Sequence, residues 1–199
     1  MVIALIDYGA GNIFSVKNAF EALGTEIILT SDRDTILAAD KVVLPGVGSF
    51  SDAISSLKRH KLENTIIDLV KMEKPFLGIC VGLQLMFEHS EEGDVNGLGI
   101  FRGKIKKFPL DICKKVPQIG WNGIDIKNND NSIFKGVSDN YFYLVHSYYL
   151  ETDENILATA DYGIEYTCAY SYKNVNLVQF HPEKSGKTGL KLLENFVNM

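Results

Sequence analysis

The first half of the chain alternates short apolar runs with segments of helical periodicity, and this alternation is the feature that most constrains the fold. Buried strands are expected at 2–8, 26–30, 41–45 and 75–80, and helices at 13–23, 49–59, 62–72 and 81–89. Gly24 follows the first helix as a C-cap. A strand–helix–strand rhythm predicts an open, mostly parallel sheet with helices on both faces, which is an α/β architecture.

The second half has a different character, because Gly, Asn, Tyr and Val dominate from residue 97 to residue 180. Short strands are expected at 104–108, 123–127, 141–150, 157–160 and 176–180, and a closing amphipathic helix at 188–197. The first four of these strands predict an antiparallel extension packed beside the parallel sheet. No repeat, low-complexity segment or Pro/Ser-rich linker interrupts the chain, so residues 1–199 are expected to form one domain.

Composition and charge argue against several classes of protein. The chain has 20 Lys and Arg residues against 25 Asp and Glu, a formal charge of −5 and a pI of about 5.4, which argues against binding to nucleic acid. No apolar run approaches the roughly 18 residues of a transmembrane helix. The N-terminal apolar run lacks the basic region of a signal peptide. We therefore expect no membrane association, and the odd number and wide spacing of the cysteines indicate a reducing, cytoplasmic compartment.

The chain has three cysteines, and one of them lies in a reactive context. Cys80, Cys113 and Cys168 are odd in number and widely spaced, which fits neither a disulfide framework nor a metal site. Cys80 is the centre of Gly78-Ile79-Cys80-Val81-Gly82, a G-x-C-x-G motif at a predicted strand-to-helix turn, as in a nucleophile elbow. The helix N-terminus favours the thiolate, and the Val81 N–H would point at a developing oxyanion. Cys113 and Cys168 are expected to be packing residues, and a structural role between two glycines is the alternative for Cys80.

A cysteine nucleophile needs a base that a third group orients. Among the histidines, His60 and His89 lie in charged, helical surroundings and are expected at the surface. His181 ends an apolar strand and is followed by Pro182 and Glu183. In extended backbone, residues i and i+2 project to the same side. Glu183 is therefore expected to hydrogen-bond the His181 ring.

Two further segments are placed to serve the same site. The loop Pro45-Gly46-Val47-Gly48 follows the third strand, and loops at the carboxyl edge of a parallel sheet meet beside the elbow. Its two glycines would let a peptide N–H turn toward the site as a second oxyanion donor. Gln84 lies one turn after Cys80 and is within reach of a polar substrate, although an exposed helical position is its ordinary alternative.

Taken in this order, the motifs resemble those of the class I (triad) glutamine amidotransferases, and the resemblance covers nearly the whole chain. Within that family the chain looks like the glutaminase subunits of imidazole glycerol phosphate synthases, which belong to histidine biosynthesis. The narrower resemblance rests on five short segments, which are Asp7-Tyr8-Gly9-Ala10-Gly11-Asn12, Pro45-Gly46-Val47-Gly48-Ser49-Phe50, Gly120-Trp121-Asn122, His146-Ser147-Tyr148 and His181-Pro182-Glu183-Lys184-Ser185.

The resemblance implies a catalytic triad of Cys80, His181 and Glu183. Cys80 would attack the side-chain amide of L-glutamine. His181 would protonate the departing ammonia and then activate water to hydrolyse the γ-glutamyl thioester, and Glu183 would orient His181. No metal and no cofactor is expected for this chemistry.

The resemblance also assigns groups to the oxyanion and to the substrate. The oxyanion would be held by backbone N–H groups of the elbow and of the loop, namely those of Val81, Gly46, Val47 and Gly48. The α-amino and α-carboxylate groups of glutamine would be bound by three residues, Gln84, Ser147 and Tyr148.

A partner is implied as well. Ammonia would pass through a cyclase subunit with a (β/α)₈ barrel to a phosphoribosyl-containing substrate, giving imidazole glycerol phosphate and an aminoimidazole carboxamide ribotide. Asn12, Trp121 and Lys184 would lie at or near the interface of this heterodimer, and a Trp among small polar residues also suits an interface anchor. Family members are poorly active alone, because ligand binding in the partner sets the oxyanion loop.

Other functions stay open at this point. Gly9-Ala10-Gly11 with Asp32 downstream resembles part of a dinucleotide fingerprint, but Phe14 stands where a further glycine is needed. A paralogous glutaminase that supplies ammonia to a surface-sugar amidotransferase would carry the same triad and differ in its partner. The glutaminase of pyridoxal phosphate synthase fits less well, because no Gly-Gly-Glu-Ser segment follows the third strand.

Two more alternatives fit the sequence poorly. A catalytically dead interaction protein on this fold would have no reason to keep all three of Cys80, His181 and Glu183. A metal hydrolase needs histidines at ligand spacing, and no pair of histidines in the sequence has it.

Overall fold

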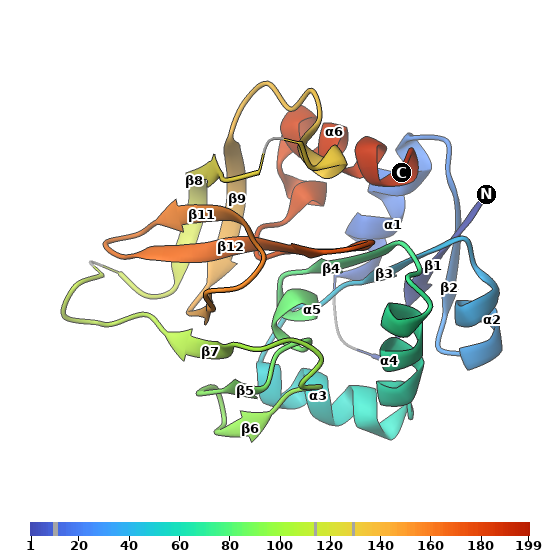
Figure 1. The fold of residues 1–199 in the computed structure, drawn as a ribbon, viewed down its shortest axis with the longest axis horizontal. Coiled ribbons are helices and arrows are strands. Elements are labelled where there is room, and N and C mark those ends of the chain that lie inside the picture. Colours follow the sequence, from blue (N-terminus) through green and yellow to red (C-terminus); the bar gives the residue numbers. More distant parts are fainter. Residues whose placement is uncertain (10–11, 114, 129) are drawn as a thin grey trace.

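A computed structural model describes residues 1–9, 12–113, 115–128 and 130–199 (Figure 1). Ala10 and Gly11 lie outside the described residues, so the glycine-rich segment 9–11 and the full Asp7–Asn12 motif are not placed. Within the described ranges, no helix is long and apolar enough to cross a membrane.

A parallel sheet forms as predicted, with four strands from the N-terminal half and one from near the C-terminus. Its strands are β1 (Val2–Ile6), β2 (Glu26–Thr30), β3 (Lys41–Leu44), β4 (Phe76–Ile79) and β13 (Val175–Val178), in the order β2-β1-β3-β4-β13. All four neighbouring pairs are parallel. The residues of β3, β4 and β13 are buried throughout, as in a parallel sheet covered on both faces, and apolar residues predominate in them apart from Lys41 and Asn176.

Helices cover both faces of the parallel strands. Figure 1 shows α1 (Ile13–Ala22) and α6 (Gly186–Val197) on one side, and α3 (Phe50–Arg59) and α4 (Glu63–Lys71) on the other. Ser49 caps α3 by accepting a hydrogen bond from the Asp52 N–H. Gly24 has a φ of +73°, which ends the first helical segment as predicted.

A short helix that the sequence reasoning does not name lies between β2 and β3. This helix, α2 (Arg33–Ala38), begins at Asp32, whose carboxylate accepts a hydrogen bond of 2.8 Å from the Thr35 N–H. Asp32 therefore serves as an N-cap in this fold. A ribose-binding role for Asp32, as in the dinucleotide alternative, finds no support in that position.

The helix expected at 81–89 is much shorter in the structure and covers only α5 (Val81–Gln84). The next three carbonyl groups, which would continue the helix, accept hydrogen bonds from the segment 98–101. Leu98, for example, donates its N–H to the Leu85 carbonyl at 2.9 Å. His89 consequently lies in a strand and not in a helix, whereas His60 is the exposed C-cap of α3.

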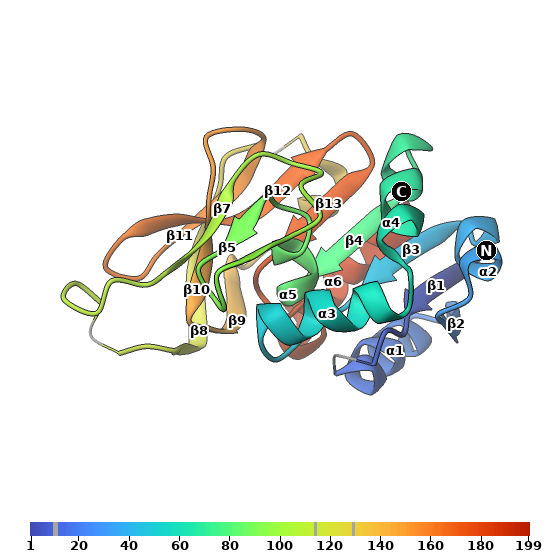
Figure 2. The ribbon, with the colours of Figure 1, turned by 90° about the horizontal axis from the view of Figure 1, so that it is seen from below.

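The second half forms the antiparallel extension. Its strands are β5 (His89–Ser90), β6 (Val95–Asn96), β7 (Lys104–Lys107), β8 (Gln118–Ile126), β9 (Tyr141–His146), β10 (Tyr148–Glu151), β11 (Ile156–Asp161) and β12 (Glu165–Tyr172). The order continues from β13 as β12-β10-β7-β5-β6, while β11 joins β12 to the β8–β9 pair. The ladders are antiparallel apart from β5 with β7. Figure 2 shows this extension beside the parallel strands.

Two expectations for this half need correction. The strand expected at 141–150 is interrupted at Ser147, because β9 pairs with β8 whereas β10 pairs with β7 and β12. The strand expected at 123–127 begins earlier, at Gln118, because its pairing with β9 runs along that whole segment. In addition, β12 is a long strand that sequence reasoning does not identify.

Strand β13 is where the two halves meet. It pairs in parallel with β4 on one side and antiparallel with β12 on the other. Beyond its end, Phe180 stacks on Phe142 of β9 with ring centroids 4.1 Å apart. The residues that follow β13 are therefore carried from the parallel sheet to the edge of the antiparallel extension, next to the strand–helix turn after β4.

Candidate active site

The turn between β4 and α5 has the geometry of a nucleophile elbow. Cys80 has φ +55° and ψ −112°, a conformation that costs energy for a residue with a side chain. The turn is also tight, because a Cβ on Gly82 would lie 2.0 Å from the Leu44 carbonyl oxygen, and one on Gly78 would lie 2.9 Å from the Gly82 oxygen. Both flanking glycines are therefore required by close backbone contact, as the motif predicts.

His181 and Glu183 form a buried pair. The His181 Nδ1 lies 2.8 Å from a carboxylate oxygen of Glu183, and both side chains are almost completely buried. The prediction of this contact is correct, but its backbone explanation is wrong. Only His181 is extended, and residues Pro182–Lys184 form a 3₁₀ turn, η2, that swings the carboxylate back to the ring.

The backbone of His181 is held from two sides. Its N–H donates to the Tyr143 carbonyl on β9 at 2.9 Å, and its carbonyl accepts from the Ser185 hydroxyl at 2.6 Å. The Ser185 hydroxyl in turn accepts from the Tyr143 N–H at 2.9 Å. This ring of hydrogen bonds fixes the histidine between the parallel sheet and the extension.

The electrostatics of His181 favour a protonated ring. Burial lowers the pKa of His181, but the neighbouring Cys80 sulfur and the Glu183 carboxylate outweigh it and raise the pKa to about 10. The other ring nitrogen, Nε2, has no hydrogen-bond partner among the described residues. A buried N–H without a protein partner, beside the Cys80 sulfur, is available to a substrate.

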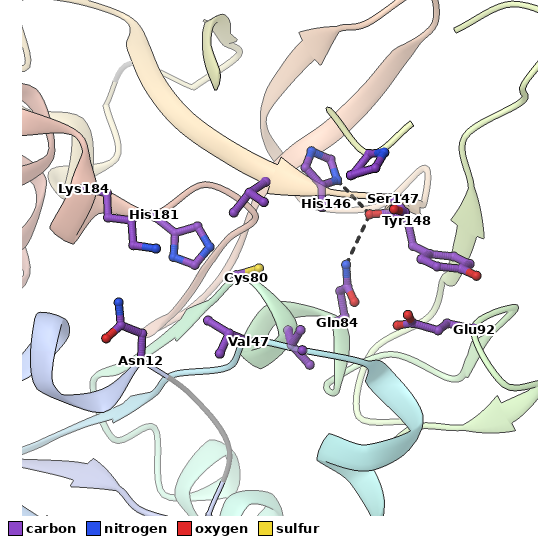
Figure 3. Close-up of a pocket in the computed structure, with 14 residues that line it drawn as sticks. Asn12, Val47, Cys80, Gln84, Glu92, His146, Ser147, Tyr148, His181 and Lys184 are labelled. Atoms are coloured by element: carbon purple, nitrogen blue, oxygen red, sulfur yellow. Dashed lines mark hydrogen bonds between the residues drawn. The ribbon is translucent and has the colours of Figure 1, made fainter. Parts of the chain in front are cut away.

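Cys80 and His181 line a cavity of about 390 Å³ at the carboxyl edge of the parallel strands, and Figure 3 shows their side chains directed into it. This is the edge at which parallel α/β sheets bind ligands. The cavity is also lined by Asn12, Val47, Gly48, Val81, Gln84, Glu92, Pro117, Val145, His146, Ser147, Tyr148 and Lys184.

The loop after β3 lies against the elbow. A Cβ on Gly46 would be 2.7 Å from the Gly82 nitrogen, and the Tyr8 hydroxyl donates a hydrogen bond of 2.9 Å to the Pro45 carbonyl. Burial and the nearby Cys80 raise the pKa of Tyr8, so the phenol stays a donor. Gly48 has a φ of +91°, which favours glycine. Gly46 itself packs behind the cavity, whereas Val47 and Gly48 face it.

Gln84 is buried and not exposed, which excludes the ordinary alternative for it. Its Nε2 lies 2.9 Å from Oε1 of Gln179 and 3.2 Å from the Tyr148 carbonyl. Both amide hydrogens are thus used within the protein. Only the Gln84 Oε1 is left to accept a hydrogen bond from a bound molecule.

The antiparallel extension supplies the opposite wall of the cavity, with Ser147 and Tyr148 as predicted. It also supplies His146, and the loop after β5 brings in Glu92. Burial lowers the pKa of His146 to about 4, so this ring is neutral. Glu92 accepts a hydrogen bond of 2.7 Å from the Phe50 N–H at the start of α3. Nothing in the sequence around Glu92 distinguishes it from a solvated acidic loop residue.

The three residues expected at a partner interface lie at the cavity or beside it. Asn12 and Lys184 line the cavity on the His181 side of Cys80, as Figure 3 shows. The Lys184 ammonium lies 5.9 Å from the centre of the Tyr143 ring, and Trp121 packs edge-on against the same ring at 6.3 Å. The Trp121 side chain is 57% exposed.

Some expected site residues do not touch the cavity. Glu183 and Gly46 lie one layer behind it, and Trp121 lies beside it. Cys113 and Cys168 are buried packing residues with free thiols, as predicted. Among the described residues, no group of three or more His, Cys, Asp or Glu side chains has the arrangement of a metal site.

Comparison with known proteins agrees with this geometry. The family model of the class-I glutamine amidotransferases matches residues 4–199. The chain belongs to that family. Its relatives include imidazole glycerol phosphate synthase subunit HisH 1 of Methanococcus maripaludis, which is 45% identical with both chains fully covered. HisH of Dehalococcoides mccartyi is 46% identical over all of this chain and 97% of that one. The expected family, enzyme class and HisH-type glutaminase function are confirmed.

Solved structures confirm the fold class. The crystal structure of a glutamine amidotransferase superposes with a TM-score of 0.77 at 14% identity, covering all of this chain and 98% of that one. A glutamine amidotransferase from Thermotoga maritima superposes with a TM-score of 0.65 at 18% identity, covering all of this chain and 83% of that one. The α/β architecture of the amidotransferases is therefore shared at low sequence identity.

Proposed function

We propose that Cys80, His181 and Glu183 are the catalytic triad with which this amidotransferase hydrolyses L-glutamine. The observation that carries the proposal is a strained, buried cysteine at an elbow that shares one cavity with His181, whose ring is paired with the buried Glu183 behind it. The same arrangement of nucleophile, base and orienting acid recurs in unrelated hydrolases.

The first half of the reaction breaks the C–N bond of the side-chain amide. Cys80 attacks the amide carbon as the thiolate, its proton having passed to Nε2 of His181, and a tetrahedral intermediate forms. The C–N bond then breaks, and the nitrogen leaves with that proton from Nε2. The raised pKa of His181 supports this role, because the ring holds that proton at neutral pH. The products of this half are ammonia and a γ-glutamyl thioester on Cys80.

Hydrolysis of the thioester is the second half. His181, now neutral, takes a proton from a water molecule that attacks the thioester carbon, and glutamate and the thiolate are released. Glu183 keeps Nδ1 as the donor toward its carboxylate, so Nε2 is the nitrogen that exchanges protons with the substrate.

The oxyanion of each tetrahedral intermediate would be bound by backbone N–H groups. The Val81 N–H begins α5 next to the sulfur, and the Gly46–Gly48 loop borders the same cavity. Such donors contribute roughly 100- to 1000-fold to the rate when they are correctly placed. Gly48, with its positive φ, is the position where a peptide can turn with little steric cost.

The cavity also supports one orientation of the substrate. Glu92 and the Ser147–Tyr148 segment lie on one side of Cys80, and Asn12 and Lys184 lie on the other (Figure 3). The α-ammonium group of glutamine would lie near Glu92 and the Gln84 Oε1, with the α-carboxylate near Ser147 and Tyr148. Ammonia would then be released toward Asn12 and Lys184.

A cyclase partner fits that direction of release. The relatives are named as subunits of imidazole glycerol phosphate synthase, which implies a heteromeric enzyme. We propose that Trp121, Lys184 and Asn12 contact a (β/α)₈-barrel cyclase subunit, which receives ammonia for synthesis of imidazole glycerol phosphate. An exposed Trp against a Tyr ring is a typical anchor for such an interface.

Two further proposals concern the chain as a whole. Residues 1–199 are proposed to act as one domain, because the buried apolar residues of both halves belong to one cluster. A cytoplasmic location is proposed because the three cysteines are free.

The test is glutamine hydrolysis by the purified chain, first alone and then with the cyclase and its nucleotide ligand. Strong stimulation by the liganded cyclase is the expected result. Glutamine hydrolysis at the same rate with and without the cyclase would support the triad but contradict the proposed partner. This result is expected for a glutaminase that supplies ammonia to a surface-sugar amidotransferase. Absence of glutamate release in the liganded complex would contradict the proposed function.

A further inference from the structure

We propose that Gln179 is a positioning residue for the nucleophile, which donates a side-chain N–H to the sulfur of Cys80. The inference rests on the proposed role of Cys80 and adds a group to that site. Gln179 is the first residue after β13 and is completely buried. Its Nε2 lies 3.6 Å from the Cys80 Sγ, within the range of a hydrogen bond to sulfur.

The direction of this contact follows from a chain of hydrogen bonds that begins at a backbone carbonyl. The Tyr148 carbonyl can only accept, so the Gln84 atom that faces it at 3.2 Å must be the nitrogen. That nitrogen has a second hydrogen, and it points at the Gln179 side chain at 2.9 Å. The Gln179 atom on that side must therefore be the oxygen, and its nitrogen must face the sulfur.

Burial locks this arrangement. Gln179 is completely buried and does not line the cavity, so water is not at hand to replace a partner that its amide loses. If the Gln179 amide turned over, two amide nitrogens would face each other and the oxygen would face the sulfur, leaving buried donors unpaired. The Tyr148 carbonyl also accepts from His146 Nδ1 at 2.8 Å, which fixes the far end of the chain.

A side-chain N–H directed at the Cys80 sulfur would help to stabilise the thiolate at the elbow. Because α5 contains only four residues, a long helix dipole is not available to favour a thiolate. The Gln179 amide is then the side-chain N–H within hydrogen-bond distance of the sulfur, and the charged His181 ring lies beside it. An N–H that points at sulfur favours the thiolate over the thiol, since hydrogen bonds to charged acceptors are the stronger ones. It also holds the side chain in one orientation for attack.

The experiment measures alkylation of Cys80 by iodoacetamide as a function of pH, read by mass spectrometry of the peptide that contains Cys80. Two variants remove the donor. Gln179→Met keeps the length of the side chain, and Gln179→Glu keeps an oxygen that accepts from Gln84. Both are expected to move the alkylation profile to higher pH, with alkylation about tenfold slower at neutral pH.

A matched control lies on the same strand. Asn176 of β13 is a buried amide whose nitrogen lies 3.9 Å from the thioether sulfur of Met199, outside the cavity. Asn176→Leu is expected to leave the alkylation profile of Cys80 unchanged.

In the complex with the cyclase, Gln179→Glu should lower kcat for glutamine about tenfold and leave KM within about twofold, because the contact to Gln84 is retained.

A second measurement uses the wild-type chain and therefore does not depend on whether a variant folds. In a ¹⁵N-labelled sample, the Gln179 side-chain amide signal is expected to move when Cys80 is alkylated. An unchanged signal, or unchanged alkylation profiles in folded Gln179 variants, would overturn the inference. Alkylation needs neither glutamine nor a partner. A shifted profile together with a wild-type complex that releases no glutamate would therefore contradict the proposed function and leave the role of Gln179 intact.

Discussion

Two buried histidines line the same cavity and differ in charge. His181, beside the parallel sheet, has its pKa raised to about 10, whereas His146, in the antiparallel extension, has its pKa lowered to about 4. Burial lowers both values. The difference comes from the neighbours, because His181 lies beside Cys80 and Glu183, and His146 is bonded to a backbone carbonyl and to the Tyr166 hydroxyl.

The two sides of the cavity supply different chemical groups. The parallel edge holds the charged and strained groups, namely a cysteine with positive φ and an ion pair of His181 and Glu183. The extension supplies a neutral histidine, His146, that has two hydrogen-bond partners, together with Glu92, Ser147 and Tyr148 on the opposite wall. Changes at the parallel edge should therefore lower kcat, and changes in the extension should affect stability or binding.

The largest effect is expected for Cys80→Ser. Loss of the thiol removes the nucleophile, so glutamine-dependent turnover should fall by about 10⁴-fold or more. His181→Ala should cost nearly as much, because members of a triad act as a unit. The measurement is product formation by the complex from glutamine and, as a control, from ammonium salts. Ammonia-dependent synthesis should survive in both variants, and persistent use of glutamine would contradict the assignment.

A smaller loss is expected for Glu183→Gln. The amide can still accept from the His181 ring, but the negative charge that stabilises the imidazolium is gone. We expect kcat for glutamine to fall roughly 100- to 1000-fold, with the acidic group of the pH–rate profile moving to lower pH. A loss equal to that of Cys80→Ser would mean that Glu183 does more than orient the ring.

His146 predicts a pH dependence of stability. Its folded pKa of about 4 lies below the unfolded value of 6.5, so the unfolded chain binds more protons between these pH values. The free energy of unfolding should therefore fall by about 3 kcal/mol as the pH drops from 6.5 to 4. Urea unfolding of the wild type and of His146→Gln measures this, and the variant should lose that part of the slope. His60→Gln, at an exposed histidine, is the control.

The smallest effect on the isolated chain is expected for Trp121→Ala. The side chain is largely exposed, so the free energy of unfolding should change by less than about 1 kcal/mol. Affinity for the cyclase should fall roughly tenfold or more, as measured by titration calorimetry. Met72→Ala removes another exposed apolar side chain, at the end of α4, and should leave the affinity unchanged. A larger loss of stability than of affinity would make Trp121 a packing residue.

Local patterns in the sequence predicted the parallel strands and the elbow, but not the short helix α2 or the early end of α5. Buried strands appear as apolar runs, and the Gly-x-Cys-x-Gly turn predicts the elbow because its glycines are needed for backbone contacts nearby. The His181–Glu183 contact was also predictable from two residues close in sequence, although a 3₁₀ turn and not an extended strand brings them together.

Features that depend on distant parts of the chain were not predictable. The end of α5 is set by residues 98–101, which take the carbonyl groups that a longer helix would use. Gln84 is buried because Tyr148 and Gln179 lie against it, and both arrive from other strands. Glu92 enters the cavity through a loop with no distinctive sequence.

The central claim is that glutamine is attached covalently to Cys80 during turnover. The most direct measurement is mass spectrometry of the liganded complex, quenched in acid during hydrolysis of glutamine and digested into peptides. The account predicts a glutamyl group on the peptide that contains Cys80, and none on those with Cys113 or Cys168. Glutamate release without an adduct on Cys80, or an adduct on another cysteine, would contradict it.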